Sequence, residues 1–367
     1  MTPPPDPPDA PKPGAAAGAW HRAPRPLRLA ATLLIGVAAG WLAERARLPL
    51  PWMIGPMLVT AALGVAGAPL AASNRLRNAG QWAIGVALGL YFTPEVAALL
   101  PRLAPAIGVG AAWALLAGWT FHRWLRWRHP QETPATTFFA AAIGGASEMA
   151  VLADRAGARI DRVAAAHSLR VLIVLLVVPF AFQFAGLQGL DPSPPAAQAV
   201  QPGGLALLAA ATLAGVALMQ RAGLPNPSVL GALAVTAALT AAGVTWSGLP
   251  PAVSSAGQLF IGVALGARFT PDFLRAAPRW MASVALGSVG LIVASAGFGT
   301  LVALATGLHP ATGVLATAPG GIAEMCITAK VLALGVPAVT AFHVVRYLAV
   351  LLLTAPLFRA EARRLGH

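Results

Sequence analysis

The chain has 367 residues, of which 57% are hydrophobic and 10% are charged, and its mean hydropathy is +0.71. Soluble domains carry roughly 25% charged residues, so this composition excludes an ordinary soluble enzyme, and the apolar content excludes disorder for most of the chain. The class that remains is an all-α polytopic membrane protein. The net charge of +13 comes largely from arginines in short clusters between apolar runs. Such clusters are typical of loops beside anionic lipid headgroups, so we expect a lipid bilayer and no nucleic acid as partner.

The N-terminal stretch, residues 1–26, holds nine prolines and predicts a disordered Pro-rich tail. Apolar runs of near-membrane length follow it. They lie near 27–43, 54–72, 79–93, 103–121, 135–153, 163–186, 205–220, 227–244, 255–268, 281–306, 311–335 and 338–358. A helix needs roughly 20 residues to cross a bilayer, so the short runs at 79–93 and 255–268 indicate half-helices or re-entrant pieces. The expected count is therefore ten to twelve membrane segments.

An internal repeat divides this membrane part into two homologous halves, expected at 27–200 and 201–367. The stretch AGQWAIGVALGLYFTPE from Ala79 and the stretch AGQLFIGVALGARFTPD from Ala256 agree at 12 of 17 positions. The blocks PLPWMIG and PNPSVLG, the two GGxxEM blocks and the two HxxR blocks recur in the same order at nearly the same offset. Such agreement indicates a duplication and not a composition bias.

The orientation of the two halves depends on whether each half has an even or an odd number of spans. Six spans per half would give parallel halves, and five would give inverted ones. In the first half the basic loop follows the fourth run, at Arg123, Arg126 and Arg128. In the second half it follows the third run, where Arg268 and Arg275 lie. This shift favours inverted repeats.

Each half contains a predicted helix break followed by a carboxylate. Adjacent glycines weaken a helix inside an apolar run, and a proline removes a donor. Backbone freed at membrane depth must face protein or a water-filled cavity, and an intramembrane glutamate is a functional candidate by default. The same glutamates could instead cap the broken ends and hold the fold. The residues concerned are Gly144, Gly145 and Glu148 in the first half and Pro319, Gly320, Gly321 and Glu324 in the second.

A histidine and an arginine three residues apart recur within an apolar run of each half, at His167 with Arg170 and at His343 with Arg346. Each arginine could neutralise a buried glutamate, hold an anionic substrate, or extend to lipid headgroups. A histidine or a glutamate could carry a coupling proton.

Two glutamines, Gln81 and Gln258, begin the Gly-spaced blocks of the repeat. The glycines four residues apart in these blocks indicate close helix packing, and the glutamines themselves either pack or reach a solute.

The paired GQxxIGVALGxxFTP blocks, with the GGxxEM and HxxR blocks, resemble the AbrB membrane-protein family, whose members are built from a duplicated unit of this kind. The resemblance covers about residues 27–360. It implies a multi-pass protein of the bacterial inner membrane. Members have been labelled transcriptional regulators or ammonia monooxygenases, and the best-known member is described as a regulator of another gene's expression. This chain departs from the pattern at its first break, where no proline precedes Gly144.

The duplication, the twin breaks and the intramembrane charges together favour a secondary transporter or exporter for a small organic solute, with or without coupled protons. The alternative is a membrane-embedded regulator of gene expression without transport activity. A membrane oxygenase is disfavoured, because two arginines would stand beside the histidines and glutamates that could hold a metal. A DNA-binding regulator is disfavoured because no helix-turn-helix could leave these apolar runs. We therefore expect neither an enzyme nor a cofactor or metal site, while a homo-oligomer is compatible with the sequence.

Overall fold

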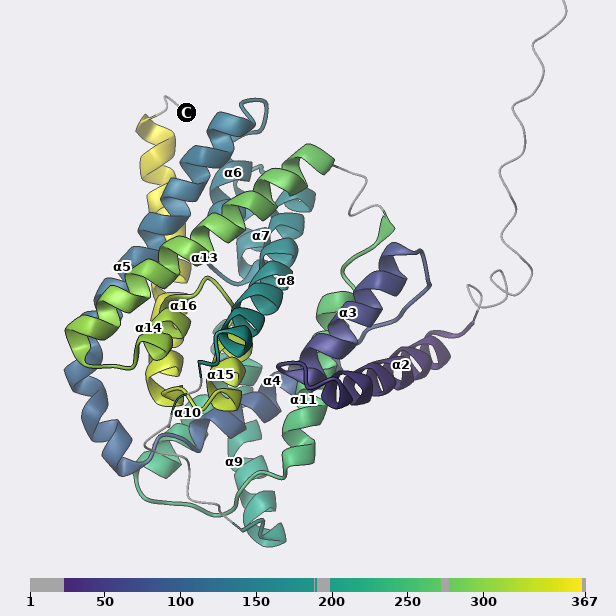
Figure 1. Cartoon of the computed structure of the whole chain (residues 1–367), viewed down its shortest axis with the longest axis vertical. Helices are drawn as coiled ribbons and strands as arrows, with labels where there is room; N and C mark the ends of the chain where they lie inside the picture. Colours follow the sequence, from purple (N-terminus) through teal and green to yellow (C-terminus); the bar gives the residue numbers. More distant parts are fainter. Residues whose placement is uncertain (1–22, 188, 190–198, 272–276, 365–367) are drawn as a thin grey trace, which may run out of the picture.

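The computed structural model describes residues 23–187, 189, 199–271 and 277–364, and within them every regular element is a helix (Figure 1). Most of the predicted tail, residues 1–22, lies outside the described residues, and its last residues open the first helix. The first half forms α2 (Arg25–Arg45), α3 (Pro51–Val65), α4 (Asn74–Gly89), α5 (Pro94–Arg128), α6 (Pro134–Ala141), α7 (Ala146–Arg155) and α8 (Ile160–Phe184). The second half forms α9 (Pro202–Arg221), α10 (Pro227–Ala241), α11 (Pro251–Gly266), α13 (Pro278–Thr306), α14 (Pro310–Thr317), α15 (Ile322–Val331) and α16 (Val336–Arg364).

Six of the described helices, namely α2, α5, α8, α9, α13 and α16, are long and apolar enough to cross a membrane. The chain is therefore a multi-pass membrane protein, as its composition predicts. Six is fewer than the ten to twelve expected segments, because the other apolar runs form short helices. The helices α3, α10 and α11 have 15 or 16 residues, which is about 24 Å at 1.5 Å per residue and less than a hydrocarbon core of about 30 Å.

Proline marks the first residue of many helices. It opens α3, α5, α6, α9, α10, α11, α13 and α14, where its missing N–H costs nothing and its fixed φ suits the first turn. Leu50 and Asn226 precede two of these prolines at equivalent places in the two halves, and both adopt the left-handed conformation. The second prolines of the PLPWMIG and PNPSVLG blocks, Pro51 and Pro227, thus mark equivalent helix starts in the two halves.

The helices sort into two spatial groups, and each group takes equivalent elements from both halves. The scaffold group consists of α2, α3 and α4 packed with α9, α10 and α11. The hairpin group consists of α5 to α8 packed with α13 to α16. Between the groups, close helix packing is mainly that of α4 and α10 against α15, α5 and α16. One hydrophobic core cluster includes side chains of both groups, and Gln183 of α8 donates to the carbonyl oxygen of Arg47 at 2.8 Å. Figure 1 shows α2, α3 and α11 beside one another, apart from α13 and α16.

Glycines allow the scaffold helices of the two halves to touch through their backbones. A Cβ built on Gly80 would lie 2.6 Å from the carbonyl oxygen of Gly257, and these two glycines occupy equivalent positions. A Cβ on Gly85 would lie 2.5 Å from the carbonyl oxygen of Val229 in the other half. The Gly-spaced blocks therefore serve close packing, as their spacing predicts.

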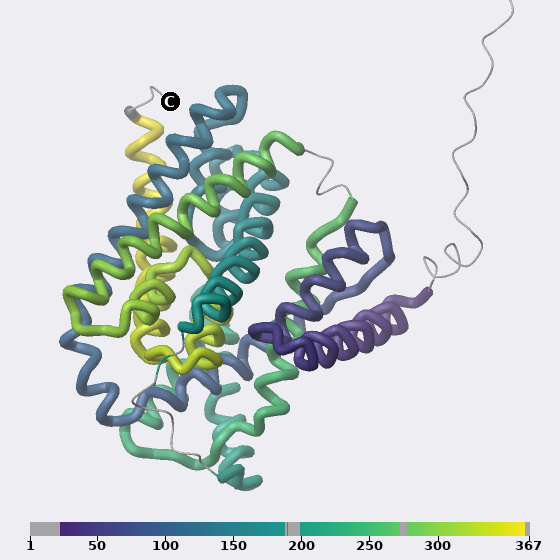
Figure 2. The backbone as a smooth tube through the Cα atoms, in the orientation of Figure 1, coloured from purple at the N-terminus to yellow at the C-terminus, as the bar shows by residue number. Residues whose placement is uncertain are grey.

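The equivalent long helices α5 and α13 pack in opposite directions. Trp113 of α5 donates a hydrogen bond to Ser295 at 3.2 Å, and further along the same helix the ring of Phe121 meets Gly287. At the end of α5, His129 contacts the ring of Trp280, with ring centroids 5.2 Å apart. The residue numbers of these contacts rise along α5 and fall along α13, so the two helices are antiparallel, as the tube in Figure 2 also shows.

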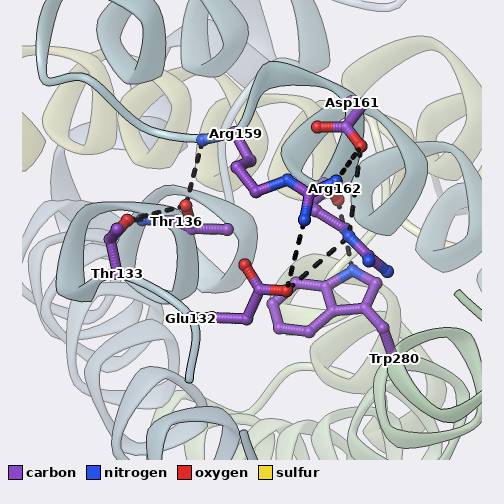
Figure 3. Close-up of polar contacts among 7 residues, drawn as sticks. All are labelled: Glu132, Thr133, Thr136, Arg159, Asp161, Arg162 and Trp280. Carbon is purple, nitrogen blue, oxygen red and sulfur yellow. Dashed lines mark hydrogen bonds and ion pairs between the residues drawn. The ribbon is translucent and has the colours of Figure 1, made fainter. Parts of the chain in front are cut away.

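In each half the two short helices, α6 with α7 and α14 with α15, form a hairpin whose two ends lie at the same level. In the first half, the backbone N–H of Arg159, just before α8, donates to the Thr136 hydroxyl in the first turn of α6 at 3.0 Å (Figure 3). In the second half, Gly335, just before α16, lies against the side chain of Thr312 in the first turn of α14. The chain therefore enters and leaves each hairpin on one side, which is a re-entrant arrangement. The sequence analysis expected re-entrant pieces at 79–93 and 255–268 instead, and these runs overlap the helices α4 and α11.

Candidate functional site

Both predicted helix breaks are present. Helix α6 ends at Ala141 and α7 begins at Ala146, and helix α14 ends at Thr317 and α15 begins at Ile322. The residues at the two ends of each break have extended ψ angles of 133° to 161°. The first break forms without a counterpart of Pro319, because paired glycines followed by a helix start are sufficient to interrupt the helix.

The two glutamates fold back over the glycines that precede their helices. Glu148 is the third residue of α7 and Glu324 is the third residue of α15. A Cβ on Gly145 or on Gly321 would collide with the carboxylate of its own glutamate. A carboxylate in this place accepts from the free N–H groups of the first turn and interacts favourably with the helix dipole. This placement supports the capping alternative for these glutamates, which stays a prediction.

The two histidines bind the first helix of each hairpin, which is α6 in the first half and α14 in the second. The Nε2 atom of His167 lies 2.9 Å from the carbonyl oxygen of Phe139, and the Nε2 atom of His343 lies 2.8 Å from that of Leu315. Both side chains are buried. Because each histidine is bound to its own hairpin and does not line the cavity described below, these contacts provide a structural role for the pair.

The two arginines bind the carbonyl groups at the broken ends. Arg170 donates through Nη2 to the carbonyl oxygen of Ala142 at 2.9 Å and contacts Nδ1 of His167 at 2.8 Å. Arg346 donates through Nη1 to the carbonyl oxygen of Ala318 at 2.6 Å and through Nη2 to that of Gly320. A cation at a helix C-terminus satisfies free carbonyl groups and interacts favourably with the dipole.

The expected ion pairs between these arginines and the intramembrane glutamates do not form. Among the described residues, the ion pairs within 4.0 Å join Arg159 and Arg162 to Glu132 and Asp161. This cluster lies where the starts of α6 and α8 meet the start of α13. There the carbonyl group of Arg162 accepts a hydrogen bond from the indole N–H of Trp280 at 3.3 Å (Figure 3). The helix ends, and not the glutamates, therefore provide the partners of Arg170 and Arg346.

A cavity of about 330 Å³ lies between the scaffold group and the hairpin group, and both breaks line it. Most of the predicted site residues line this cavity. They are Gln81, Gly144, Gly145, Glu148, Arg170, Pro319, Gly320, Gly321, Glu324 and Arg346. Gln258, His167 and His343 do not line it. The duplicated breaks are thus brought together at one polar site.

Four further polar residues line the cavity that the sequence analysis did not assign to the site, namely Arg77, Asn226, Arg268 and Tyr347. Arg77 and Arg268 lie in or beside the repeated blocks, but their counterparts in the other half are Ser254 and Tyr91. A comparison of the two halves therefore does not identify these two arginines, because it finds only residues that both halves share. The available signal for Arg77 was its position one helical turn before Gln81.

The two halves of the cavity differ in exposure. Only Met149 and Ala153 are buried in α7, whereas seven of the ten residues of α15 are buried. Ser147 is exposed, while Ala323, its counterpart after the second break, is 6% exposed. Helix α7, after the first break, is therefore largely exposed, and helix α15, after the second break, is packed into the protein.

The site, the duplication and the helices define a multi-pass membrane protein in which two equivalent hairpins meet at a polar cavity. A family model described as "Transition state regulatory protein AbrB" matches residues 52–361. The chain therefore belongs to the AbrB family, as the repeated motifs indicate. It is also similar to a protein of Bacillus subtilis (strain 168) described as "Uncharacterized protein YhjN", with 26% identity over 355 residues, which cover 89% of this chain and 91% of the relative.

Proposed function

We propose that this protein is a secondary transporter, without enzymatic activity, that moves a small solute by shifting the hairpin group against the scaffold group. The observation that carries the proposal is the cavity between the two groups, which receives the broken ends of both hairpins. Broken helices that place free backbone groups at a shared central site are a recurring feature of secondary transporters. Because packing between the groups is limited to a few elements, a change in their relative position would expose the cavity to one side or the other.

The unequal exposure of α7 and α15 supports this reading. Equivalent elements that differ in burial are expected if the structure represents one of two access states, with the roles of the hairpins exchanged in the other. We infer further that the halves are inverted repeats, because their equivalent helices α5 and α13 run antiparallel and each hairpin is re-entrant.

The distribution of arginines supports an orientation for the protein. The ends of α5, α7 and α16 and the starts of α8 and α13 gather at one end of the hairpin group, as the contacts among them require. This end carries Arg123, Arg126, Arg128, Arg155, Arg159, Arg162, Arg279, Arg359 and Arg363. By the positive-inside rule it faces the cytoplasm, so the first hairpin would enter from that side of the bacterial inner membrane.

The experiment is counterflow in proteoliposomes that are loaded with a defined mixture of metabolites and analysed by mass spectrometry. We expect at least one solute to exchange faster than in empty liposomes. Glu324→Gln should lower that rate at least tenfold, because the substitution removes a charge that lines the cavity. Glu95→Gln is the matched control, since Glu95 also lies in the first turn of a helix but is exposed and outside the cavity.

Two results would count against the proposal. If the folded protein exchanges no solute of the mixture, the alternative of a membrane-embedded regulator gains. If exchange is intact in Glu324→Gln, the second break has no part in transport.

A further inference from the structure

We propose that the cavity binds a small organic anion, held through a carboxylate or a comparable oxyanion group by Arg77 and Arg268 of the scaffold group and by the hairpin helix ends. The inference rests on the proposed transport function, since it names the chemical class of the solute. It starts from the charges that line the cavity.

The cavity has more cationic than anionic groups. Four arginines and two glutamates line it, which leaves an excess of two positive charges when all are ionised. Arg170 and Arg346 are bound to carbonyl groups at the hairpin breaks. Glu148 and Glu324 are placed at the first turns of α7 and α15. The hydrogen-bond partners of Arg170 and Arg346 are therefore helix ends. Glu324 lies near Arg268 and Arg346 without an ion pair within 4.0 Å among the described residues, so it offsets only part of the positive charge.

Arg77 and Arg268 are the cations that lack such a partner. Within the part of the chain that the structure describes, neither forms an ion pair within 4.0 Å. Arg77 makes one long hydrogen bond, 3.5 Å from Nη2 to Asn78 Oδ1, and its buried Nε atom has no partner. Both side chains are only partly exposed. A partly buried guanidinium is stabilised by an anion that accepts two parallel hydrogen bonds, as a carboxylate does.

Donor groups surround the same space. The first turns of α7 and α15 line the cavity together with the first turn of α10 at Pro227 and Ser228, and a helix N-terminus attracts anions. The hydroxyl of Tyr347 adds a further donor. Tyr347 is 7% exposed and lines the cavity, where its hydroxyl lies next to the Glu148 carboxylate. An oxyanion in the cavity would accept from this hydroxyl in place of Glu148.

The size of the cavity and its charge limit the choice of solute. A volume of about 330 Å³ lies at the lower end of ligand pockets, which hold roughly 300–1,000 Å³. A cation would face four guanidinium groups, and a neutral solute would leave Arg77 and Arg268 without a counter-charge. A small anion of metabolite size meets both conditions.

The test measures binding to the full-length protein in detergent, independently of transport. Succinate and inorganic phosphate are titrated while the midpoint of thermal unfolding is followed, at an ionic strength held constant with sodium chloride. Succinamide is the neutral control of the same shape, and putrescine is the cationic control. The variants are Arg268→Gln and, as matched control, Arg102→Gln, because Arg102 is exposed on α5 outside the cavity.

We expect a saturable rise of the midpoint with succinate or phosphate, and no comparable rise with succinamide or putrescine. The apparent affinity should fall about tenfold or more in Arg268→Gln, because a hydrogen bond to a charged group is lost. It should stay unchanged in Arg102→Gln. If Arg268→Gln does not fold, Arg77→Gln takes its place.

The inference is overturned if the neutral or cationic control acts as strongly as the anions, if the anion effect is equal in Arg268→Gln, or if neither anion acts at tens of millimolar. Anion binding without exchange in proteoliposomes would instead contradict the transport proposal. Exchange of neutral or cationic solutes alone would retain transport and remove the anion.

Discussion

The glycine contacts between the two halves make a quantitative prediction for Gly85→Ala. Gly85 of α4 faces the backbone of α10, and a Cβ there would lie 2.5 Å from the carbonyl oxygen of Val229 and 3.1 Å from the backbone nitrogen of Leu233. Real Cβ atoms essentially never come within 3.0 Å of another heavy atom. Because the obstacle is backbone and not a flexible side chain, α4 and α10 would have to move apart.

The magnitude follows from two opposing effects. Overpacking of a tight contact costs about 1–3 kcal/mol, and the upper part of that range applies when backbone must move. Alanine is favoured over glycine in a helix by about 1 kcal/mol. We therefore expect Gly85→Ala to lower the free energy of unfolding by about 2 kcal/mol. Gly108→Ala is the control, since Gly108 lies in α5 with nothing within 4 Å of a built Cβ, and it should be neutral or stabilising.

The assay is thermal unfolding of the purified variants in one detergent, followed by the loss of the monodisperse peak in size-exclusion chromatography. Gly85→Ala should unfold several degrees below the wild type, and Gly262→Ala, its counterpart against Met53, should behave alike. If Gly85→Ala is as stable as Gly108→Ala, the two halves are not packed backbone to backbone as described.

Three further predictions concern charged and titratable groups. Arg346→Gln should cost about 1–3 kcal/mol, because buried carbonyl groups lose their partner; an unfolding midpoint equal to that of the wild type would contradict this. Burial lowers the pKa of His129 below its usual range, although nearby Glu132 acts in the opposite direction. The unfolded chain therefore binds a proton more readily, and stability should fall as the pH drops below the ordinary histidine pKa of about 6.5. If His129→Gln loses as much stability as the wild type between pH 7.5 and 5.5, His129 is not the cause of the loss. Glu132→Gln should destabilise the protein more than Asp161→Asn, because the Glu132 side chain is 8% exposed and that of Asp161 is 58% exposed; equal midpoints would contradict the burial argument.

Local patterns in the sequence predict the helix breaks of the hairpin group better than the hydrogen bonds that hold the broken ends. The paired glycines before Glu148 and Glu324 indicate both breaks, because glycine weakens a helix wherever the helix lies. The partners of Arg170 and Arg346 could not be predicted in the same way. They are carbonyl groups of helix ends 26 to 29 residues away, and any residue type supplies such a carbonyl.

The division into spatial groups was also beyond the reach of the sequence. The repeat identifies two halves along the chain, but the contact of Gly80 with Gly257 interleaves them in the scaffold group. For a related reason the sequence analysis did not single out Arg77 and assigned Arg268 to a basic loop, whereas both line the cavity. The comparison of the halves finds residues that both halves share, whereas these two break the symmetry of the cavity.

The central claim, that one cavity between the two groups opens alternately to each side, is tested most directly by the counterpart positions Ser147 and Ala323. Each is replaced by cysteine in a Cys326→Ala background, since native Cys326 is fully buried and lies outside the cavity. The variants are labelled in sealed vesicles of both orientations with a small membrane-impermeant thiol reagent. Because both positions line the same cavity, the account predicts that each cysteine reacts from either side, and that cysteine at 147 reacts faster than cysteine at 323. Reaction of both from one side alone, or of neither from any side, would contradict it.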